Sequence, residues 1–445
     1  MIQFITRIDW LTVASRVSFA ALILGSFAFA GVAAAGQAVD ILALSMSALT
    51  LFISTVVLQF SERHMRADAH QSRYALLVAC FVATLLVLAW APNIIAFALA
   101  WLVSGAVLAN LVGHVAGCSE AMQARRRCNV AFAVSNVALL GALALLYWNS
   151  GSLELGVAAA AAGGNPQIAI TASLLILIAA MARSALPPFS GWLLGSMSAP
   201  TPVSALMHGG FVNAGGFLLI RFGDVLQATP IAQFAAIAAG LLAAIYGTGI
   251  MLVRADVKGV LAGSTVAQMG FLVLSCGLGA YGAALWHIIG HALFKSWLFL
   301  NAGSTIGLPV RRDRAEFSAR TAVLVLLGAS AAATVMYLVT PLEQVSLVGM
   351  FLALMTLAVA ILAAGKTRWV AIALVVPLLG MSLLVAETLD SRLEGPASHQ
   401  MPIAVPIAIA AVIAIGWIVQ QRFAARGLPR PLYLVLLNAG VLHAR

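Results

Sequence analysis

Charged side chains are rare in this sequence. They make up 9% of its 445 residues, and hydrophobic residues account for 62%. Soluble proteins use about a quarter charged residues, so this chain has too few to cover a soluble protein's surface. A polar segment long enough to form a soluble catalytic module is also missing. The composition therefore excludes a soluble enzyme and predicts an integral membrane protein.

The signatures of common catalytic and cofactor sites are absent as well. The four cysteines are scattered, without a CxxC pair or metal-ligand spacing, and we expect them to fill apolar positions. No P-loop, nucleophile elbow or pair of catalytic carboxylates occurs. The run 277–282 matches GxGxxG, but it lies between two apolar runs and no acid follows about 20 residues later, which excludes nucleotide binding. We therefore predict no catalytic site, bound cofactor or metal in this chain.

Apolar runs of bilayer-spanning length, about 20 residues, repeat along the whole chain. They predict an all-α polytopic membrane protein with about 14 transmembrane helices in a single domain over 1–425. A tail over 426–445 is expected to lie at the membrane interface or against a partner. The first run is longer than a signal-peptide core and is predicted to be a retained helix. The runs lie at 13–35, 40–60, 74–91, 93–113, 128–148, 167–199 (broken), 203–222, 231–252, 257–278, 281–305, 320–340, 345–364, 368–388 and 402–420.

The Arg and Lys residues behind the net charge of +10 lie mostly in short loops between the apolar runs. This placement is typical of charge that sets membrane topology and argues against nucleic-acid binding. Intervening loops such as 149–165 and 223–230 contain no Lys or Arg. Cytoplasmic loops of membrane proteins carry the excess of positive charge, so this alternation places both termini in the cytoplasm. The basic connections contain Arg63, Arg66 and Arg73; Arg125 to Arg127; Arg254 and Lys258; Arg311, Arg312 and Arg314; Lys366 and Arg368; and Arg422 and Arg426.

One apolar run is interrupted by Pro187 and Pro188, because proline lacks a backbone donor and clashes with the preceding helical turn. Lipid cannot satisfy the freed backbone groups, so such a break requires surrounding protein or a wet cavity. Arg183, His208 and Asn213 lie beside this break in the sequence. Ionisable groups in such a place indicate an ion or proton path.

A row of ionisable residues occupies one later run. His287, His291 and Lys295 are spaced i, i+4, i+8, which covers about 12 Å of one helix face. Imidazoles titrate near neutral pH, so the row can pass protons if water bridges the gaps. Two alternatives remain open. The histidine pair could chelate zinc, although no HExxH glutamate or third ligand lies nearby, or the histidines could bond neighbouring helices structurally.

Other polar residues allow two interpretations each. His208 follows Ser204 by four residues and could make either a relay contact or a packing hydrogen bond. Asp256 and Lys258 lie at the predicted cytoplasmic start of a helix. They could form an interfacial anchor pair, or they could form the entrance of a proton path. The nearby glycines are expected to permit close helix contact; they are Gly209, Gly210, Gly215 and Gly216.

Three stretches resemble the antiporter-like subunits of respiratory complex I (NADH-quinone oxidoreductase subunits L, M and N) and the related Mrp cation/proton antiporters. They are Arg183-Ser-Ala with Trp192 and Pro200 to His208; Asp256-Val-Lys258 with Ser264 to Gly270; and His287-x-x-x-His291-Ala-Leu-Phe-Lys295. Together they cover about 180–305, within a motif-bearing core of about 166–305. The resemblance implies an antiporter-like fold with a proline-broken helix and two inverted repeats. It also implies a proton path through Arg183, His208, Asn213, Lys258, His287, His291 and Lys295, with Asp256 as its entrance.

Within that family, the run from Gly209 to Arg221 resembles the membrane subunits of DAB inorganic-carbon accumulation complexes, the DabB type. This resemblance implies a cytoplasmic partner of the DabA type, related to β-carbonic anhydrases and carrying zinc. It further implies a bacterial inner membrane. A cation gradient, expected to be protons, would be coupled there to CO2 hydration and bicarbonate accumulation.

The sequence departs from the family pattern at three places. Arg183 stands where the family has lysine, and Leu102 stands where a glutamate usually follows a tryptophan like Trp101. No lysine occurs between 321 and 342, where the second half usually carries one. Arginine scarcely deprotonates, so Arg183 is expected to hold a fixed charge. Three hypotheses follow: a conducting subunit for carbon accumulation, a proton-translocating subunit of a quinone oxidoreductase or Mrp-type complex, and a non-conducting anchor.

Overall fold

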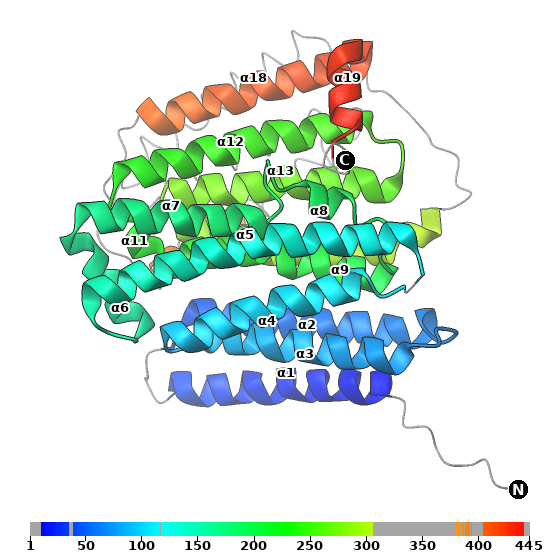
Figure 1. Ribbon diagram of the computed structural model, residues 1–445, viewed down its shortest axis with the longest axis horizontal. Coiled ribbons are helices and arrows are strands. Elements are labelled where there is room, and N and C mark those ends of the chain that lie inside the picture. Colours follow the sequence, from blue (N-terminus) through cyan, green and yellow to red (C-terminus); the bar gives the residue numbers. More distant parts are fainter. Residues whose placement is uncertain are drawn as a thin grey trace, which may run out of the picture.

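The computed structural model describes residues 10–34, 39–115, 117–305 and 404–439, with the short pieces 380–382, 384–386, 388–391 and 393. Every regular element in these residues is a helix, and Figure 1 shows the long helices stacked side by side from α1 to α18. Ten of the helices described are long and apolar enough to cross a membrane. The prediction of an all-α polytopic membrane protein is therefore confirmed.

The helices follow the apolar runs closely in chain order. They are α1 (Trp10–Ala34), α2 (Ile41–His64), α3 (Gln71–Trp90), α4 (Ile94–Val112), α5 (Ser119–Ser150), α6 (Leu155–Ala161), α7 (Pro166–Arg183), α8 (Gly191–Leu194), α9 (Thr201–Gly209), α10 (Ala214–Arg221), α11 (Gly223–Gln227), α12 (Pro230–Val253), α13 (Val257–Gly277), α14 (Tyr281–Leu300), α18 (Ala404–Arg426) and α19 (Arg430–Leu437). Three short 3-10 turns are η1 (Ala162–Gly164), η2 (Phe211–Asn213) and η3 (Ala302–Thr305).

The predicted runs at 320–340 and 345–364, and most of 368–388, lie outside the described residues. The total of about 14 helices and the two inverted repeats therefore stay predictions. One boundary differs clearly from the sequence prediction, because α5 begins at Ser119 instead of 128. The helix continues through Arg125 to Arg127, since charged residues at a membrane surface do not end a helix.

Side-chain caps explain where several membrane helices begin. Asp40, Asn93, Asn165 and Asp256 each precede a helix and accept a hydrogen bond from a backbone N–H of its first turn. The first turn of a helix has N–H groups without intrahelical partners, which short polar side chains satisfy. These four residues therefore fix where α2, α4, α7 and α13 begin.

Small residues set the closest helix contact. A Cβ added at Gly247 of α12 would overlap the Ala267 nitrogen of α13, and one at Gly240 would lie 2.6 Å from the Leu274 nitrogen. These glycines let the two backbones touch along much of their length, as small residues do in membrane interfaces.

The chain breaks twice near the predicted interruption. Helix α7 ends at Arg183, and residues 184–190, with a cis peptide bond between Pro187 and Pro188, turn the chain into α8. The predicted run at 203–222 also contains a break, because α9 stops at Gly209 and η2 separates it from α10. The Asn213 amide donates to the Gly209 carbonyl at 2.9 Å, so a side chain satisfies a carbonyl at the end of α9.

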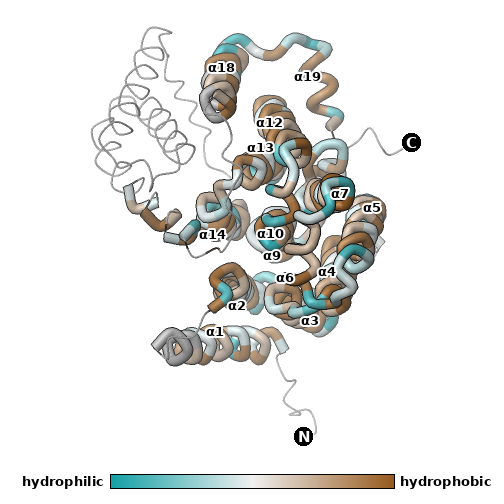
Figure 2. Tube along the Cα trace, turned by 90° about the vertical axis from the view of Figure 1, so that its left-hand side faces the viewer, coloured by the Kyte–Doolittle hydropathy of each residue, from teal (hydrophilic) through white to brown (hydrophobic). Residues whose placement is uncertain are grey.

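This broken span lies in the centre of the described bundle. Figure 2 shows α9 and α10 ringed by α2, α4, α7, α13 and α14. In its most apolar stretch 94% of the residues are buried, more than in the other nine spans described. Its irregular backbone is therefore enclosed by protein, as the absence of hydrogen-bonding groups in lipid requires.

The two ends of the bundle differ in charge. At one end, called the basic end below, the Lys258 ammonium donates to the Met197 and Ala199 carbonyls. The side chains of Arg125 and Arg127 lie against Gly113 and Gly195 at this end. Basic residues from connections that are far apart in the sequence thus lie together at one end of the bundle.

The opposite end, called the acidic end below, carries four described acids: Asp40, Glu154, Asp224 and Asp390. Asp40 pairs with Arg221, which closes α10, and a backbone bridge joins Asn93 to Glu154. The Gly282 N–H donates to the Asp390 carboxylate at 2.8 Å. Helices α2, α10 and α14 therefore have one terminus each at this end.

The C-terminal tail returns to the basic end. Helix α19 packs against α12, and Leu436 covers Gly249. The Arg254 guanidinium donates to the Ala439 carbonyl at 3.0 Å. The described part of the tail thus contacts this chain itself; whether a partner also touches it stays a prediction.

Candidate functional site

The centre of the candidate site is His208, near the end of α9 and fully buried. Its Nδ1 atom lies 3.0 Å from the Thr265 hydroxyl of α13, and that hydroxyl donates to the Leu261 carbonyl at 2.9 Å. Because the hydroxyl proton is used there, Thr265 accepts from Nδ1–H of His208. This assignment leaves the Nε2 lone pair free, and Nε2 has no hydrogen-bond partner in the protein.

Lys295 joins the same network from α14. Its ammonium donates to the Leu261 carbonyl at 3.0 Å, and its side chain is almost completely buried. One backbone carbonyl of α13 therefore connects a histidine of α9, through Thr265, to a lysine of α14. The sequence could not show this junction, because a carbonyl oxygen is present at every position and only the fold selects one.

His287 and His291 extend the cluster along α14. Their rings stack with centroids 5.9 Å apart, and electrostatic interactions link His291 to His287, Lys295 and His208. Neither ring nitrogen of His291 has a hydrogen-bond partner, and Nε2 of His287 has none either. The structure thus brings four of the predicted residues, His208, His287, His291 and Lys295, into one cluster.

Buried nitrogens without partners are uncommon, because each loses its bonds to water on burial. Four occur here within one cluster, on His208, His287 and His291. Such groups are normally satisfied by internal water or by a second arrangement of the side chains. The cluster is therefore suited to hold water between its imidazoles.

Arg183 occupies a separate site beside the first break. Its guanidinium donates to the Trp101 carbonyl at 2.8 Å, reaches the Asn136 amide oxygen at 3.4 Å and lies against the faces of three aromatic rings. The guanidinium carbon is 4.1 Å from the Trp101 ring centroid, 4.8 Å from Phe211 and 5.2 Å from Phe132. Ring faces attract cations, so this cage takes the place of a carboxylate.

The cage holds Arg183 without a carboxylate. The two ion pairs among the described residues, Asp68 with His114 and Asp40 with Arg221, both lie away from Arg183. A buried cation without an acid is held here by ring quadrupoles and a carbonyl. Arginine stays protonated in such a place, so Arg183 supplies a fixed positive charge.

Lys258 and Asp256 make different contacts at the basic end. Asp256 is exposed and caps α13 by accepting from the Gly259 N–H, whereas the half-buried Lys258 bonds the carbonyls before α9. An electrostatic interaction links Lys258 to His208. Lys258 therefore lies at the basic end and influences His208 through its charge, while Asp256 caps α13; its role as an entrance stays a prediction.

Asn213 contacts the backbone, and its Nδ2 donates to the Gly209 carbonyl. Three of the four nearby glycines mark close helix contacts, which confirms that expectation for them: an added Cβ would overlap the Ser296 hydroxyl at Gly209, the Ser184 hydroxyl at Gly215 and the Leu272 side chain at Gly216. Asn213 thus supports the break that presents His208.

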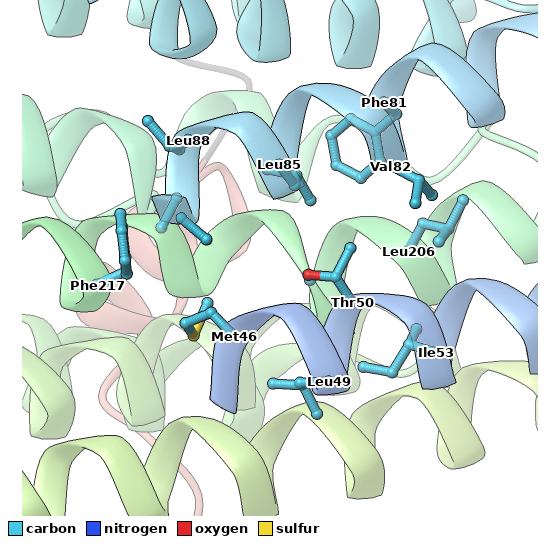
Figure 3. Close-up of a pocket in the computed structure, with 13 residues that line it drawn as sticks. Met46, Leu49, Thr50, Ile53, Phe81, Val82, Leu85, Leu88, Leu206 and Phe217 are labelled. Atoms are coloured by element: carbon cyan, nitrogen blue, oxygen red, sulfur yellow. The ribbon is translucent and has the colours of Figure 1, made fainter. Parts of the chain in front are cut away.

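The side of the break that faces α2 and α3 is apolar. Figure 3 shows a small pocket there, lined by Met46, Leu49, Phe81, Leu206 and Phe217, among others, and with Thr50 as its hydroxyl-bearing residue. Its volume is about 30 Å³. An apolar cavity of this size offers water few hydrogen-bond partners.

Sequence reasoning missed two polar features. Thr265 lies within one of the family motifs, but nothing in the sequence indicates its contact with His208. At the basic end, His114 pairs with Asp68 at 3.1 Å, and its ring meets Tyr74, whose hydroxyl bonds Ser61. An aspartate and a histidine 46 residues apart carry no local signal of this pairing.

No group of three His, Cys, Asp or Glu side chains in the described residues is arranged to hold a metal ion. His287 and His291 offer two imidazoles, and a structural zinc site needs four ligands.

The family described as NADH:quinone oxidoreductase/Mrp antiporter, transmembrane, matches residues 91–380. The chain belongs to this family. The antiporter family match contains all eight predicted site residues. It supports the resemblance drawn from the motifs and the antiporter-like character of the fold.

Curated relatives of this antiporter family differ in their names. The chain is 34% identical over 275 residues to the "probable inorganic carbon transporter subunit DabB1" of Halothiobacillus neapolitanus, covering 60% of this chain and 49% of that protein. It is 37% identical to the DabB subunit of Bacillus anthracis, covering 60% and 53%. NADH-ubiquinone oxidoreductase chain 5 of Anopheles arabiensis is 37% identical, covering 60% and 69%. The chain spans about half the length of the DabB relatives that it matches.

Solved structures of antiporter-type complexes share the fold. A chain of the Mrp complex from Dietzia sp. DQ12-45-1b aligns with a TM-score of 0.57 and 26% identity, over 91% of this chain and 48% of that one. A chain of an archaeal membrane-bound sulfane sulfur reductase aligns with a TM-score of 0.62 and 18% identity, over 97% and 91%. The second likeness concerns the fold alone.

Proposed function

We propose that this chain is a proton-conducting membrane subunit of a DAB-type inorganic-carbon accumulation complex. The observation that carries the proposal is the cluster of His208, His287, His291 and Lys295, which gathers four unpartnered ring nitrogens in the centre of an antiporter-like bundle. The similarity to subunits named DabB supplies the carbon-accumulation part.

One mouth of the proposed proton route lies at the basic end, which positive-inside reasoning assigns to the cytoplasm of a bacterial inner membrane. Lys258 stands at this mouth, and Asp256 shapes it by starting α13. Protons pass between His208, Lys295 and His291 through bridging water, and His287 continues the row toward the acidic end. Imidazole suits this task because it accepts a proton on one nitrogen and releases one from the other.

Arg183 contributes to the route through its field. A guanidinium that keeps its proton repels other cations and thereby limits how many protons occupy the cluster at once. Asn213 holds the break in α9–α10 open. Neither residue takes a proton in the proposed path.

Proton movement down its gradient biases a partner that hydrates CO2. The proposed partner is a cytoplasmic zinc protein related to β-carbonic anhydrases, the DabA type, and it docks at the basic end. Zinc and the hydration chemistry belong to that partner, because this chain is proposed to carry neither. Affinity purification of the chain with metal analysis of co-eluting protein tests this pairing.

The first prediction concerns the cluster itself. His291→Ala or Lys295→Ala is expected to abolish the rescue of bacteria that lack carbonic anhydrase and grow in air, because each change removes a titratable member of the row. Growth rate in air against growth in CO2-enriched air is the measurement. Glu154→Gln, which changes an exposed titratable residue at the acidic end, away from the proposed docking face, is the control and should rescue fully. Full rescue by normally expressed His291 and Lys295 variants would contradict the proposal.

A second candidate is a proton-translocating subunit of a quinone oxidoreductase or Mrp-type complex. The identity with NADH-ubiquinone oxidoreductase chain 5 favours it. The position of Arg183 disfavours it, since a caged arginine without a carboxylate cannot relay a proton as a lysine can. Co-purification with redox subunits in place of a zinc protein would select this candidate. Proton flux in liposomes that contain the complex distinguishes both from a non-conducting anchor.

A further inference from the structure

The lipid-facing side of α2 carries a polar cleft and an apolar groove that adjoin each other. The cleft lies between α1 and α2, has a volume of about 830 Å³ and is lined by polar side chains, including Arg16, Gln59, Arg63 and His64. The groove lies between α2 and α14 and has a volume of about 300 Å³. Val56 and Phe60 line both, so the two spaces form one continuous surface.

The cleft is positively charged and lies at the basic end. Arg16 comes from the second turn of α1, and Arg63 and His64 come from the last turn of α2. Glu62 is the acid in the lining, and Ser15, Thr12 and Gln59 add groups that can form hydrogen bonds. Lys258 interacts electrostatically with His64 and adds to the positive field. An anion with several oxygens, such as a phosphate, fits this lining.

The groove is apolar and open to the membrane. Its walls include Phe52, Leu293, Trp297 and Leu300, and the first three are more than a third exposed. Residues 52 to 60 of α2 extend about 12 Å along the helix, away from the cleft and toward the bilayer centre. The shape and polarity therefore match an acyl chain that descends from a headgroup held at the basic end.

We propose that this surface binds one anionic phospholipid, with its phosphate between Arg16 and Arg63 and one acyl chain along the α2–α14 groove. Charge complementarity selects this occupant, because an apolar helix of a partner would leave the two arginines unpaired. The proposal is independent of proton conduction and of carbon accumulation.

Native mass spectrometry of the full-length chain in detergent tests the proposal, with phosphatidylglycerol, phosphatidylcholine and inorganic phosphate as separate probes. One phosphatidylglycerol per chain is expected to bind in preference to phosphatidylcholine. Each basic side chain that faces the headgroup contributes about a fivefold preference for an anionic lipid, so Arg16→Ala/Arg63→Ala is expected to lose about 25-fold in affinity. Arg66→Ala, an exposed arginine just beyond α2, removes a similar charge outside the cleft and should bind as the wild type does.

A second variant tests the groove without touching a charge. Leu293→Trp adds bulk to the groove at a side chain that is 40% exposed, so folding should be unaffected. It is expected to weaken phosphatidylglycerol binding and leave the binding of inorganic phosphate unchanged. Equal loss in the Arg66 variant, equal binding of phosphatidylcholine, or binding of phosphate alone would overturn the proposal. Co-purification of a polypeptide bound to the cleft would do the same.

Discussion

At the residue scale, two buried cations, Arg183 and Lys295, make no ion pair with a carboxylate in the part of the chain that the structure describes. Arg183 lies in a cage of three aromatic rings, and Lys295 donates to the Leu261 carbonyl. An ion pair would hold a proton firmly on a lysine, whereas a neutral carbonyl lets it leave more easily. The difference between the two cations is chemical: arginine keeps its proton and lysine can release it.

Thr265 provides the sharpest test at this scale. Thr265→Val keeps the shape but leaves Nδ1 of His208 without an acceptor, which is expected to lower the free energy of unfolding by about 1–3 kcal/mol. It should also reduce proton flux and shift its pH profile, because the tautomer of His208 is no longer set. Thr265→Ser, which retains the hydroxyl, should restore the pH profile. Proton flux into liposomes as a function of pH measures this, and an unchanged profile in the valine variant would show that Thr265 only packs.

At the element scale, the end of α9 lies in close contact with α14. The Ser296 hydroxyl and the Ala292 carbonyl of α14 lie close to Gly209 of α9. The Asn213 amide donates a hydrogen bond to the Gly209 carbonyl. Helix α14 carries the histidine–lysine row, so this contact sets the distance between His208 and that row.

Gly209→Ala tests the contact. Its Cβ would overlap the Ser296 hydroxyl and lie 2.9 Å from the Ala292 carbonyl, so α9 and α14 must separate. Overpacking of this kind costs about 1–3 kcal/mol. Gly290→Ala on the exposed face of α14 meets nothing within 4 Å and should be neutral or slightly stabilising. Thermal unfolding of both variants in detergent is the measurement, and equal melting temperatures would contradict the close contact.

At the scale of the whole molecule, charge is divided between the two ends. The basic end collects the arginines and Lys258, and the acidic end collects Asp40, Glu154, Asp224 and Asp390. Asp224 in α11 is half-buried between membrane helices, and burial raises the pKa of its carboxyl above the usual value. The acidic end therefore contains an acid whose ionisation opposes folding.

Stability should depend on pH through Asp224. Because its pKa is higher in the folded than in the unfolded state, its contribution to stability is largest below the unfolded value of about 4 and falls as pH rises through the folded value. Asp224→Asn removes this penalty, so its melting temperature should exceed that of the wild type at pH 8 and approach it at pH 4. Glu154→Gln, which changes an exposed acid at the same end, is the control. A wild-type advantage at pH 8 would refute the assignment.

Hydropathy alone predicts most of the described helices, because each span must bury about 20 apolar residues in lipid and satisfy its own backbone. The spacing of His287, His291 and Lys295 likewise places them on one face of α14, since the helical period is a local property. Hydropathy and local spacing do not predict the second break, at Gly209. That break lies where α14 packs closely against α9, and a contact between two helices cannot be derived from the sequence of one.

Composition and local spacing by themselves determined that this chain spans a membrane, where its helices run and which of them carry ionisable residues. Only the tertiary structure decided what those residues touch. The Leu261 carbonyl joins His208 to Lys295, and Trp101, Phe132 and Phe211 surround Arg183, because helices distant in sequence meet around α9. Contacts of that kind arise from packing geometry, which a one-dimensional pattern does not contain.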